Sequence, residues 1–252
     1  MRPDTYQMQA RRQKDYWWHR ARRQMAVALL RRFGVAAGGK WLDVGCGAGG
    51  NLGVPSRFCA EFVVGLDISP IAMELAAKSS CCAHLVQADG SRGLPFVDSS
   101  FDVATVFNVL SHDWIKDDQS ALREVSRVLR PNGMILITEP AFEILSREMD
   151  EVGMSSRRYR RPSFMKLCKG AGFNVLFASY FTCIGFPILL ASKVARRLSP
   201  RRRLMTAPDL VPLTPVVNET MFKIAAAESY LISQGARMPF GTTLVCVGQK
   251  SS

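Results

Sequence analysis

The segment WLDVGCGAGG, residues 41–50, restricts the possible folds of this chain more than any other. A short apolar stretch leads to Asp43, and glycine then fills four of the six positions 45–50. A glycine-rich turn between a strand and a helix lets a small ligand lie against bare backbone in an α/β fold. Two patterns fit this turn and indicate different ligands: Gly45-x-Gly47-x-x-Gly50 and Asp43-x-Gly45-x-Gly47-x-Gly49.

The remainder of the chain alternates between strand-like and helix-like patterns. Apolar segments bounded by turn residues predict strands at 40–45, 61–69, 83–90, 101–110, 133–140, 174–182 and 241–250. Amphipathic segments, some opened by proline or ended by glycine, predict helices at 6–33, 70–79, 118–130, 163–173, 184–198 and 218–235. Such alternation predicts right-handed βαβ units, and therefore a doubly wound, mostly parallel sheet with helices on both faces.

The length of the chain, 252 residues, suits one substantial core, so we expect a single domain over 1–252. Within it we expect an N-terminal helical lid at 1–37 and a ligand-binding core built from 38–182 and 241–250. The connection at 183–240 is far longer than a usual loop. We expect it to form a mostly helical cap over the edge of the sheet where ligands bind.

The formal net charge of +12 is high for this length. Two arginine clusters contribute to it, one within 157–161 and one within 196–203. Such an excess favours an acidic partner, which can be a nucleic acid, an acidic substrate or an anionic membrane surface. A solvated basic surface is the alternative explanation for either cluster.

The seven cysteines include no paired CxxC elements of the zinc-binding kind, and residues 1–20 contain no apolar signal core. We therefore expect a cytoplasmic protein with reduced thiols. Residues 174–193 are long enough to span a membrane, but Gly185 and Pro187 interrupt them. The helix expected at 184–198 has a basic end, so it can make a peripheral contact with an anionic membrane or close a substrate pocket.

The charge at the glycine turn separates the two ligands that its patterns suggest. A dinucleotide would bring a pyrophosphate there, and Asp43, two residues before the first glycine, would repel it. S-adenosylmethionine has no phosphate, and its amino-acid end carries an ammonium that Asp43 would attract. Asp67, which ends the second expected strand, can accept hydrogen bonds from ribose hydroxyls in either ligand, or it can cap the helix that begins at Pro70.

Four blocks of the sequence occur in the order and near the spacing of a known family. The blocks are WLDVGCGAGG, VVGLDIS, VQADGSRGLPFVDSSFDVATVFNVLSH and ALREVSRVLRPNGMILITEP. Through them the chain resembles the class I S-adenosylmethionine-dependent methyltransferases, in their single-domain, small-molecule subgroup, over about residues 38–180. The resemblance implies a seven-stranded Rossmann-like sheet with an antiparallel last strand, and S-adenosylmethionine as cofactor. The cofactor-binding residues that it implies are Asp43, Gly45, Cys46, Gly47, Asp67, Ile68, Asp89, Gly90, Asn108 and Val109.

Within this implied site, the residues take different parts. Asp89 is expected at the adenine amino group with the Gly90 backbone beside it, and Ile68 is expected on the adenine face. Asn108 and Val109 are expected near the methyl donor. Nothing in the sequence activates Cys46, so backbone geometry rather than thiol chemistry explains its place in the turn.

The two ends of the chain also resemble a narrower group of such proteins, through YWWHRARRQ, NETMFKIAAAESYL and MPFGTT. Tyr16, Trp17 and Trp18 are candidate lid or substrate residues, although packing against the sheet would explain them equally well. Arg158 and Tyr159 are candidates for orienting an acidic acceptor, because arginine binds carboxylate and phosphate through paired hydrogen bonds. Histidines of that group are replaced here by Met149 and Met154, so a catalytic role for them does not transfer.

Methyl transfer is an in-line displacement that needs no metal and depends mainly on alignment. An acceptor that must lose a proton still needs a base. His112, after the fourth expected strand, is the candidate catalytic residue, because histidine titrates near neutral pH. The alternative is that His112 only shapes the cofactor pocket. No residues complete a metal site around Asp113, Asp117 and Asp118, so we expect no metal.

Three functions are compatible with these residues. The first is a methyltransferase for a small-molecule or lipid-linked acceptor, which the basic clusters suggest is acidic. The second is an RNA methyltransferase, but the chain has NVLSHD where base-modifying enzymes carry other motifs, and no RNA-binding module is apparent. We therefore do not expect a nucleic-acid partner. The third is a non-catalytic S-adenosylmethionine-binding protein, because fold alone never fixes function. The sequence carries no indication of the oligomeric state.

Overall fold

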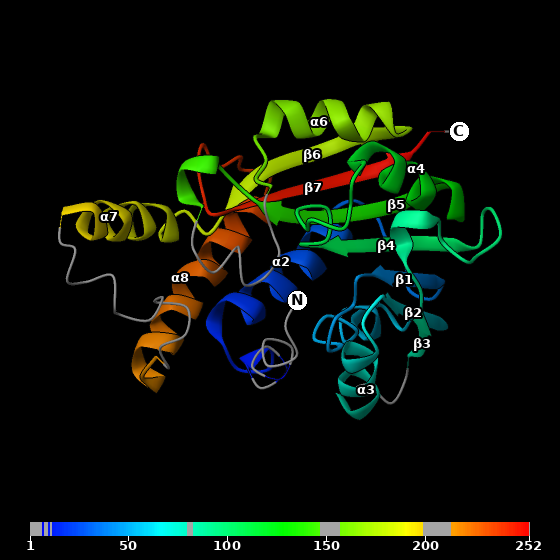
Figure 1. The fold of residues 1–252 in the computed structure, drawn as a ribbon, viewed down its shortest axis with the longest axis horizontal. Coiled ribbons are helices and arrows are strands. Elements are labelled where there is room, and N and C mark those ends of the chain that lie inside the picture. The colour runs from blue at the N-terminus through cyan, green and yellow to red at the C-terminus, as the bar shows by residue number, and fades with distance from the viewer. Residues whose placement is uncertain are drawn as a thin grey trace.

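The computed structural model describes residues 7, 10, 12–79, 83–146, 157–198 and 213–251 of the chain. One seven-stranded sheet has the order β3-β2-β1-β4-β5-β7-β6, and β7 runs antiparallel to both of its neighbours (Figure 1). This confirms the doubly wound sheet with an antiparallel last strand. The strands are β1 (Lys40–Val44), β2 (Phe62–Asp67), β3 (His84–Gln87), β4 (Phe101–Phe107), β5 (Leu129–Pro140), β6 (Phe173–Phe181) and β7 (Thr243–Lys250).

Helices cover both faces of this sheet, as Figure 1 shows. The α-helices are α2 (Trp17–Arg32), α3 (Pro70–Ser79), α4 (Asp118–Val128), α6 (Arg161–Gly170), α7 (Gly185–Leu198) and α8 (Pro215–Ser233). Short 3-10 helices are η1 (Pro55–Phe58), η2 (Gly90–Arg92) and η3 (Glu143–Leu145). One apolar core lies between the sheet and α4 and α6, and a second lies between the opposite face and α2, η1 and α8.

The central strands are apolar on both faces because each face is covered. In β4 every residue is buried except Asp102, and the first six residues of β7 are buried. This pattern is typical of strands enclosed by helices. Trp41 on β1 faces the second core, where it packs against Phe58 of η1 with ring centroids 5.1 Å apart.

The largest differences between the structure and the expected elements occur at two places. The helix expected at 6–33 is interrupted, because residues 13–15 form a turn and α2 begins only at Trp17. The helix expected at 118–130 ends at Val128, and β5 begins at once with Leu129, four residues before the predicted start. Leu129 pairs with Phe101, and the register then shifts before Val103 pairs with Met134. An apolar residue at a helix end and one at a strand start give the same local pattern, so the sequence did not separate them.

The N-terminal helix and the helix before the last strand lie against each other. Figure 1 shows α2 and α8 side by side on one face of the sheet. The Trp17 amide donates to Asn218 Oδ1 at 2.9 Å, and the Asn218 side-chain amide donates to the Asp15 carbonyl at 2.9 Å. Arg20 pairs with Glu219 at 2.7 Å. The two ends of the chain therefore form one helical layer.

Some expectations fall on other parts of the chain. Met149, Met154, Arg201–Arg203 and the centre of the expected cap lie outside the described residues. Among the helices that the structure describes, none combines the length and apolar character needed to cross a lipid bilayer.

Candidate functional site

A cavity of about 640 Å³ opens at the carboxyl ends of β1, β2 and β4. The strand order reverses between β1 and β4, and open α/β sheets bind ligands at such a point. Residues that follow the strands form its floor, and residues of α2, α7 and α8 also line it. The volume is in the usual range for small-molecule and cofactor sites.

The glycine turn forms one wall of this cavity. The Gly45 and Cys46 amides donate to the Leu66 carbonyl, which ties the turn to β2. Gly45 has a φ of 70°, and a Cβ there would clash with Val109, so only glycine fits. A Cβ on Gly47 would meet no atom within 4 Å, which shows open space above the turn. Cys46 is buried, and burial together with the charges of Asp43 and Asp67 raises its thiol pKa, so thiol chemistry is disfavoured.

Asp43 lies one layer behind the cavity wall, with 3% of its surface exposed. Thr105 Oγ1 donates to Asp43 Oδ1 at 2.6 Å, while Oδ2 is buried and has no hydrogen-bond partner among the described residues. Burial raises the pKa of Asp43 to about 7, although the Thr105 hydrogen bond and the charge of Arg22 oppose this. The carboxylate thus retains unused acceptor capacity, but it does not line the cavity, so it can act on a ligand there only through its charge and not by the contact expected of a cofactor-binding residue.

The residues expected at the adenosine end are brought together along one side of the cavity. Asp67, Ile68, Asp89 and Gly90 all line it. Asp67 accepts from the Gly47 amide at 2.9 Å and from the Ser69 amide at 2.9 Å, so it also holds the glycine turn on β2. The Ile68 side chain is 39% exposed, which is high for isoleucine and leaves an apolar face open to a flat ring.

Asn108 and Val109 follow β4 and line the same cavity. Asn108 has a φ of 57°, a left-handed conformation that turns the chain sharply after the strand. Its amide donates to the Thr138 carbonyl at 2.7 Å, whereas its buried Oδ1 has no partner in the described part of the chain.

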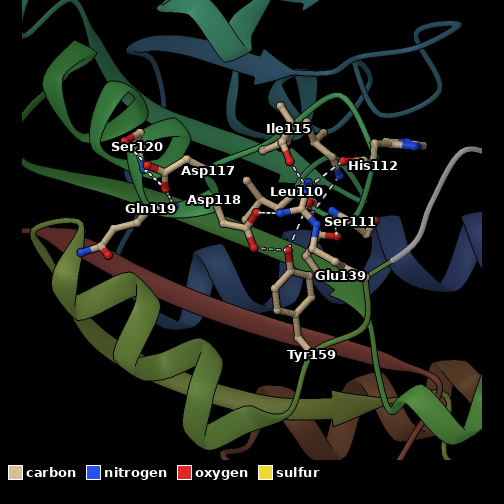
Figure 2. Close-up of polar contacts among 12 residues, drawn as sticks. Leu110, Ser111, His112, Ile115, Asp117, Asp118, Gln119, Ser120, Glu139 and Tyr159 are labelled. Atoms are coloured by element: carbon tan, nitrogen blue, oxygen red, sulfur yellow. Dashed lines mark hydrogen bonds and ion pairs between the residues drawn. The ribbon is translucent and has the colours of Figure 1, made fainter.

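Glu139, near the end of β5, fixes the backbone that follows. Its carboxylate accepts from the amides of Val109 at 2.9 Å, Leu110 at 2.8 Å and Ser111 at 3.2 Å, as the close-up partly shows (Figure 2). The side chain is fully buried, and burial raises its pKa to about 7 despite these hydrogen bonds. Glu139 therefore serves as a rigid support for the loop that carries His112.

A second support comes from the segment before α6. The Tyr159 hydroxyl lies 2.6 Å from Asp118 Oδ2 and 3.1 Å from the Leu110 carbonyl (Figure 2). Arg157 binds Asp118 and donates to the His112 carbonyl at 2.9 Å. Tyr159 is 9% exposed and does not line the cavity. Its position therefore indicates a structural role rather than the expected contact with an acceptor.

His112 reaches the cavity from this supported loop. Its ring stacks on Trp114 with centroids 4.0 Å apart and planes 13° from parallel, which restricts its orientation. Arg158 also lines the cavity, and it donates to the Ala141 carbonyl at 3.1 Å. The structure therefore brings His112 and Arg158 to the same cavity, as the sequence analysis expected of residues near an acceptor.

The N-terminal aromatic residues form another wall. Tyr16, Trp17 and Trp18 line the cavity, and they also pack against the apolar core on this face of the sheet. Both of the expected roles are therefore compatible with their positions. His19 lines it too, and burial with the neighbouring charges of Arg22 and Arg23 lowers its pKa to about 3. His19 is therefore neutral near pH 7.

No group of metal-binding side chains occurs among the residues that the structure describes. Asp117 instead caps α4, where its carboxylate accepts from the amides of Gln119 and Ser120 at 3.0 Å each. The sequence analysis overlooked two residues at the site, Glu139 and Arg22. Glu139 ends an apolar strand just as Asp43 and Asp67 do, and that pattern could have identified it.

The fold and this cavity define a class of protein: a Rossmann-like methyltransferase fold with a cavity at the topological switch point. A sequence model of a methyltransferase domain matches residues 42–137. The Malonyl-[acyl-carrier protein] O-methyltransferase of Enterobacter lignolyticus is 32% identical over 49% of this chain and 47% of its own. The Demethylmenaquinone methyltransferase of Tropheryma whipplei is 33% identical over 50% of this chain and 49% of its own.

Among solved structures, the chain is similar to a complex between the Haloferax volcanii Trm112 methyltransferase activator and a methyltransferase described as putative. The TM-score is 0.63 at 20% identity, over 97% of this chain and 92% of the other. The similarity supports the fold. The chain spans about half the length of the curated relatives that it matches. Residues 42–137 thus match a methyltransferase domain, and the similarity to named methyltransferases indicates S-adenosylmethionine as the methyl donor.

Proposed function

We propose that this protein methylates a small-molecule or carrier-linked acceptor that has an apolar body and an acidic group. The observation that carries the proposal is the composition of the cavity beyond the glycine turn. Aromatic side chains of the N-terminal segment and apolar side chains of α7 and α8 line it together with Arg158 and His112. Such a wall favours an apolar body, and the guanidinium of Arg158 suits a carboxylate or phosphate.

The named relatives agree with this chemistry. One acts on a malonyl group attached to acyl-carrier protein, which is an acid on a long carrier, and the other acts on demethylmenaquinone, which is largely apolar. Both acceptors are small molecules or carrier-linked groups. An acceptor of this kind would reach the cavity between α2, α7 and α8, which supports a cap role for 183–240.

The cofactor supplies the methyl group that is transferred. In our proposal, Asp67 accepts hydrogen bonds from the ribose hydroxyls, Asp89 accepts from the adenine amino group, and Ile68 packs on the adenine face. The glycine turn allows the amino-acid end to approach the backbone closely. His112 accepts a proton from the acceptor atom, and the aromatic wall with α8 excludes water from the reacting groups.

Titration calorimetry with S-adenosylmethionine and with NAD tests the cofactor site. We expect binding of S-adenosylmethionine only, and weaker binding by Asp67→Asn. Charge-assisted hydrogen bonds contribute about 1.5–3 kcal/mol each, so the loss should be at least about tenfold in Kd. Glu74→Gln, which changes an exposed carboxylate on α3, is the matched control and should bind as the wild type does.

A product assay with a panel of acceptors tests the reaction. The panel contains apolar carboxylic acids, acyl-carrier thioesters, phosphorylated lipids, neutral quinones and structured RNA. We expect formation of S-adenosylhomocysteine with an acidic apolar acceptor, and a lower rate in Arg158→Gln. Turnover with RNA alone would favour the RNA methyltransferase alternative. Binding of the cofactor without turnover of any acceptor would favour the non-catalytic alternative.

A further inference from the structure

We propose that an apolar groove between α7 and α8 binds a flexible hydrocarbon tail of the acceptor. The acceptor is then an amphiphile with a tail, rather than a compact acid. This inference deepens the proposed function, and it rests on that function for the identity of the ligand as the methyl acceptor. We call the surface the tail groove and define it by five side chains that line the cavity: Ile188, Leu189, Leu213, Val217 and Met221.

The tail groove extends from the apolar core to the surface of the molecule. Leu213 and Met221 are partly buried and pack against the core that lies under α2 and α8. Val217, one helical turn or about 6 Å before Met221, is 45% exposed. Ile188 of α7 is 52% exposed. The lining of the cavity therefore stays apolar out to the solvent at this end.

The exposure of these side chains is unusual for the lining of a cavity. Among the described residues that line it, three large apolar side chains are exposed, Ile68, Ile188 and Val217. Ile68 is assigned to the adenine ring. The other two come from different helices but border the same space, so they are not isolated surface residues. Adjoining apolar surface of this kind marks a site for an apolar ligand, and a bound tail would remove both side chains from water.

Polar side chains of the two helices are engaged away from the tail groove. Asn218 and Glu219 of α8 bind the N-terminal segment. Glu228 accepts from the Cys183 amide at 3.0 Å, and Lys193 of α7 donates to the Ile144 carbonyl at 2.9 Å. The five groove side chains offer no hydrogen bond to a ligand. A polar group placed there would lose its hydration without compensation, whereas a hydrocarbon tail loses nothing.

The inner part of the cavity has a different character. His112 and Arg158 line it there, so polar and apolar walls belong to one continuous space. A Cβ on Gly185 would lie 2.9 Å from Thr242 Cγ2, so glycine allows α7 to begin directly against the segment that enters β7. Figure 1 shows α7 and α8 at the same end of the molecule. An amphiphile fits this division, with its acidic head at Arg158 and its tail in the tail groove.

Calorimetry with straight-chain carboxylates tests this inference on the whole protein. The probes are butanoate, octanoate and dodecanoate, each below the concentration at which it forms micelles. S-adenosylhomocysteine is present to fill the cofactor site. Because each buried methylene group strengthens binding by up to about fourfold, we expect the Kd to fall by at least about 50-fold from butanoate to dodecanoate.

Variants of the tail groove locate the site of binding. Val217→Ser and Ile188→Ser should each weaken binding of dodecanoate by about five- to tenfold and leave butanoate nearly unchanged, because only the long tail reaches these residues. Val216→Ser is the matched control. Val216 is 76% exposed and adjoins Val217, but it does not line the cavity, so its loss should leave all three affinities unchanged. An unchanged midpoint of urea unfolding shows that each variant is folded.

The outcomes separate this inference from the proposed function. Affinity that does not rise with tail length would overturn the inference alone, and so would equal losses in Val216→Ser and Val217→Ser. Binding seen only above the micelle concentration would also overturn it, since this reports adsorption to a surfactant surface. Tail-dependent binding without methyl transfer to any acceptor would overturn the proposed function and keep the tail groove as an apolar-ligand site. If S-adenosylhomocysteine does not bind, the cofactor assignment is overturned, and the carboxylate series without it still tests the tail groove.

Discussion

Three acidic residues near strand ends organise the site at the scale of single side chains. Asp43 lies one residue before the end of β1, Asp67 ends β2, and Glu139 lies one residue before the end of β5. Asp67 and Glu139 accept backbone amides of the turns beside them, and Asp43 accepts the Thr105 hydroxyl. Each carboxylate is buried, and burial raises the pKa of each. Burial of these charged groups therefore costs stability, but their hydrogen bonds fix the geometry around the cavity.

This burial predicts a pH dependence of stability. The folded-state pKa of Glu139 is about 7, above its usual value of 4.5, so the folded chain binds more protons than the unfolded chain between these values. The free energy of unfolding should fall as pH rises through that window, by roughly 3 kcal/mol for the full shift. Asp43 acts in the same direction. Arg22 and Tyr159 interact electrostatically with Glu139.

Urea unfolding between pH 5 and pH 8 measures this effect. Glu139→Gln cannot titrate, so its free energy of unfolding should fall less steeply than that of the wild type over the same range. Stability that rises with pH in the wild type would contradict the prediction, and so would equal slopes for both proteins.

The two histidines of the cavity should behave differently in catalysis. A histidine with a pKa near 3, such as His19, stays neutral across the range in which proton transfer is usually measured, and its weak basicity makes it a poor general base. We expect His112→Ala to lower kcat by about 100-fold or more and His19→Ala to act mainly on KM. Profiles of kcat against pH, recorded for both variants with one acceptor, make the comparison. An unchanged kcat in His112→Ala would show that His112 only shapes the pocket.

At the scale of elements, the pairing of α2 with α8 closes the site. α2 carries the aromatic wall and Arg22, while α8 contributes Val217 and Met221 to the same cavity. Asn218 joins the helices through both ends of its side-chain amide. The loop after β4 is held in a comparable way by Glu139 and Tyr159 from other elements (Figure 2). Arg157 also donates to the His112 carbonyl of this loop. Elements that are distant in the sequence therefore meet at the cavity, and the hydrogen bonds between them fix its shape.

Asn218→Ala tests this helix pairing. It leaves the part-buried Trp17 amide without its acceptor, so we expect a loss of about 1–3 kcal/mol in the free energy of unfolding. Hydrogen exchange should rise in residues 12–22, and S-adenosylmethionine should bind more weakly. Thr220→Ala, two residues further on at an exposed position, removes only a hydrogen bond within α8 and serves as the control. Equal exchange in the two variants would show that Asn218 does not couple the helices.

At the scale of the whole molecule, the segment between β6 and β7 has two possible uses. Ile188 and Val194 of α7 are about half exposed, while Leu189 and Gly185 line the cavity. Arg196 and Arg197 lie in the last turn of this helix, and Arg201–Arg203 follow it in the sequence. We propose that the segment caps the acceptor and that a peripheral contact with an anionic membrane uses the same residues.

Liposome flotation separates the cap from the membrane contact. The variant changes Arg196, Arg197 and Arg201–Arg203 to Gln, and the vesicles are either neutral or anionic. Because exposed charges are screened within about 8 Å at 0.15 M salt, binding to an anionic surface should weaken as salt rises and disappear in the variant. Flotation that does not depend on lipid charge or on salt concentration would contradict a membrane contact made by these basic residues. No flotation, with lost turnover of a water-soluble acceptor, would leave the cap as the function of the segment.

The sequence by itself determined the features that are encoded within short windows. Periodicity and turn residues placed all seven strands, because burial on one or two faces is expressed in consecutive side chains. The glycine turn and Asp67 were recognisable for the same reason, since the strand, the turn and the acid follow one another. The early start of β5 at Leu129 was missed because a single apolar residue fits a helix end and a strand start equally.

Only the tertiary structure decided how distant residues complete the site. Glu139 holds amides about 30 positions away, and Tyr159 meets a carbonyl 49 positions away. Arg22 resembles any basic residue of an amphipathic helix until α2 packs on the sheet and buries it beside Asn51, 29 positions on. The physical reason is that burial, and with it pKa, depends on what other elements cover, and no short window of sequence contains that information.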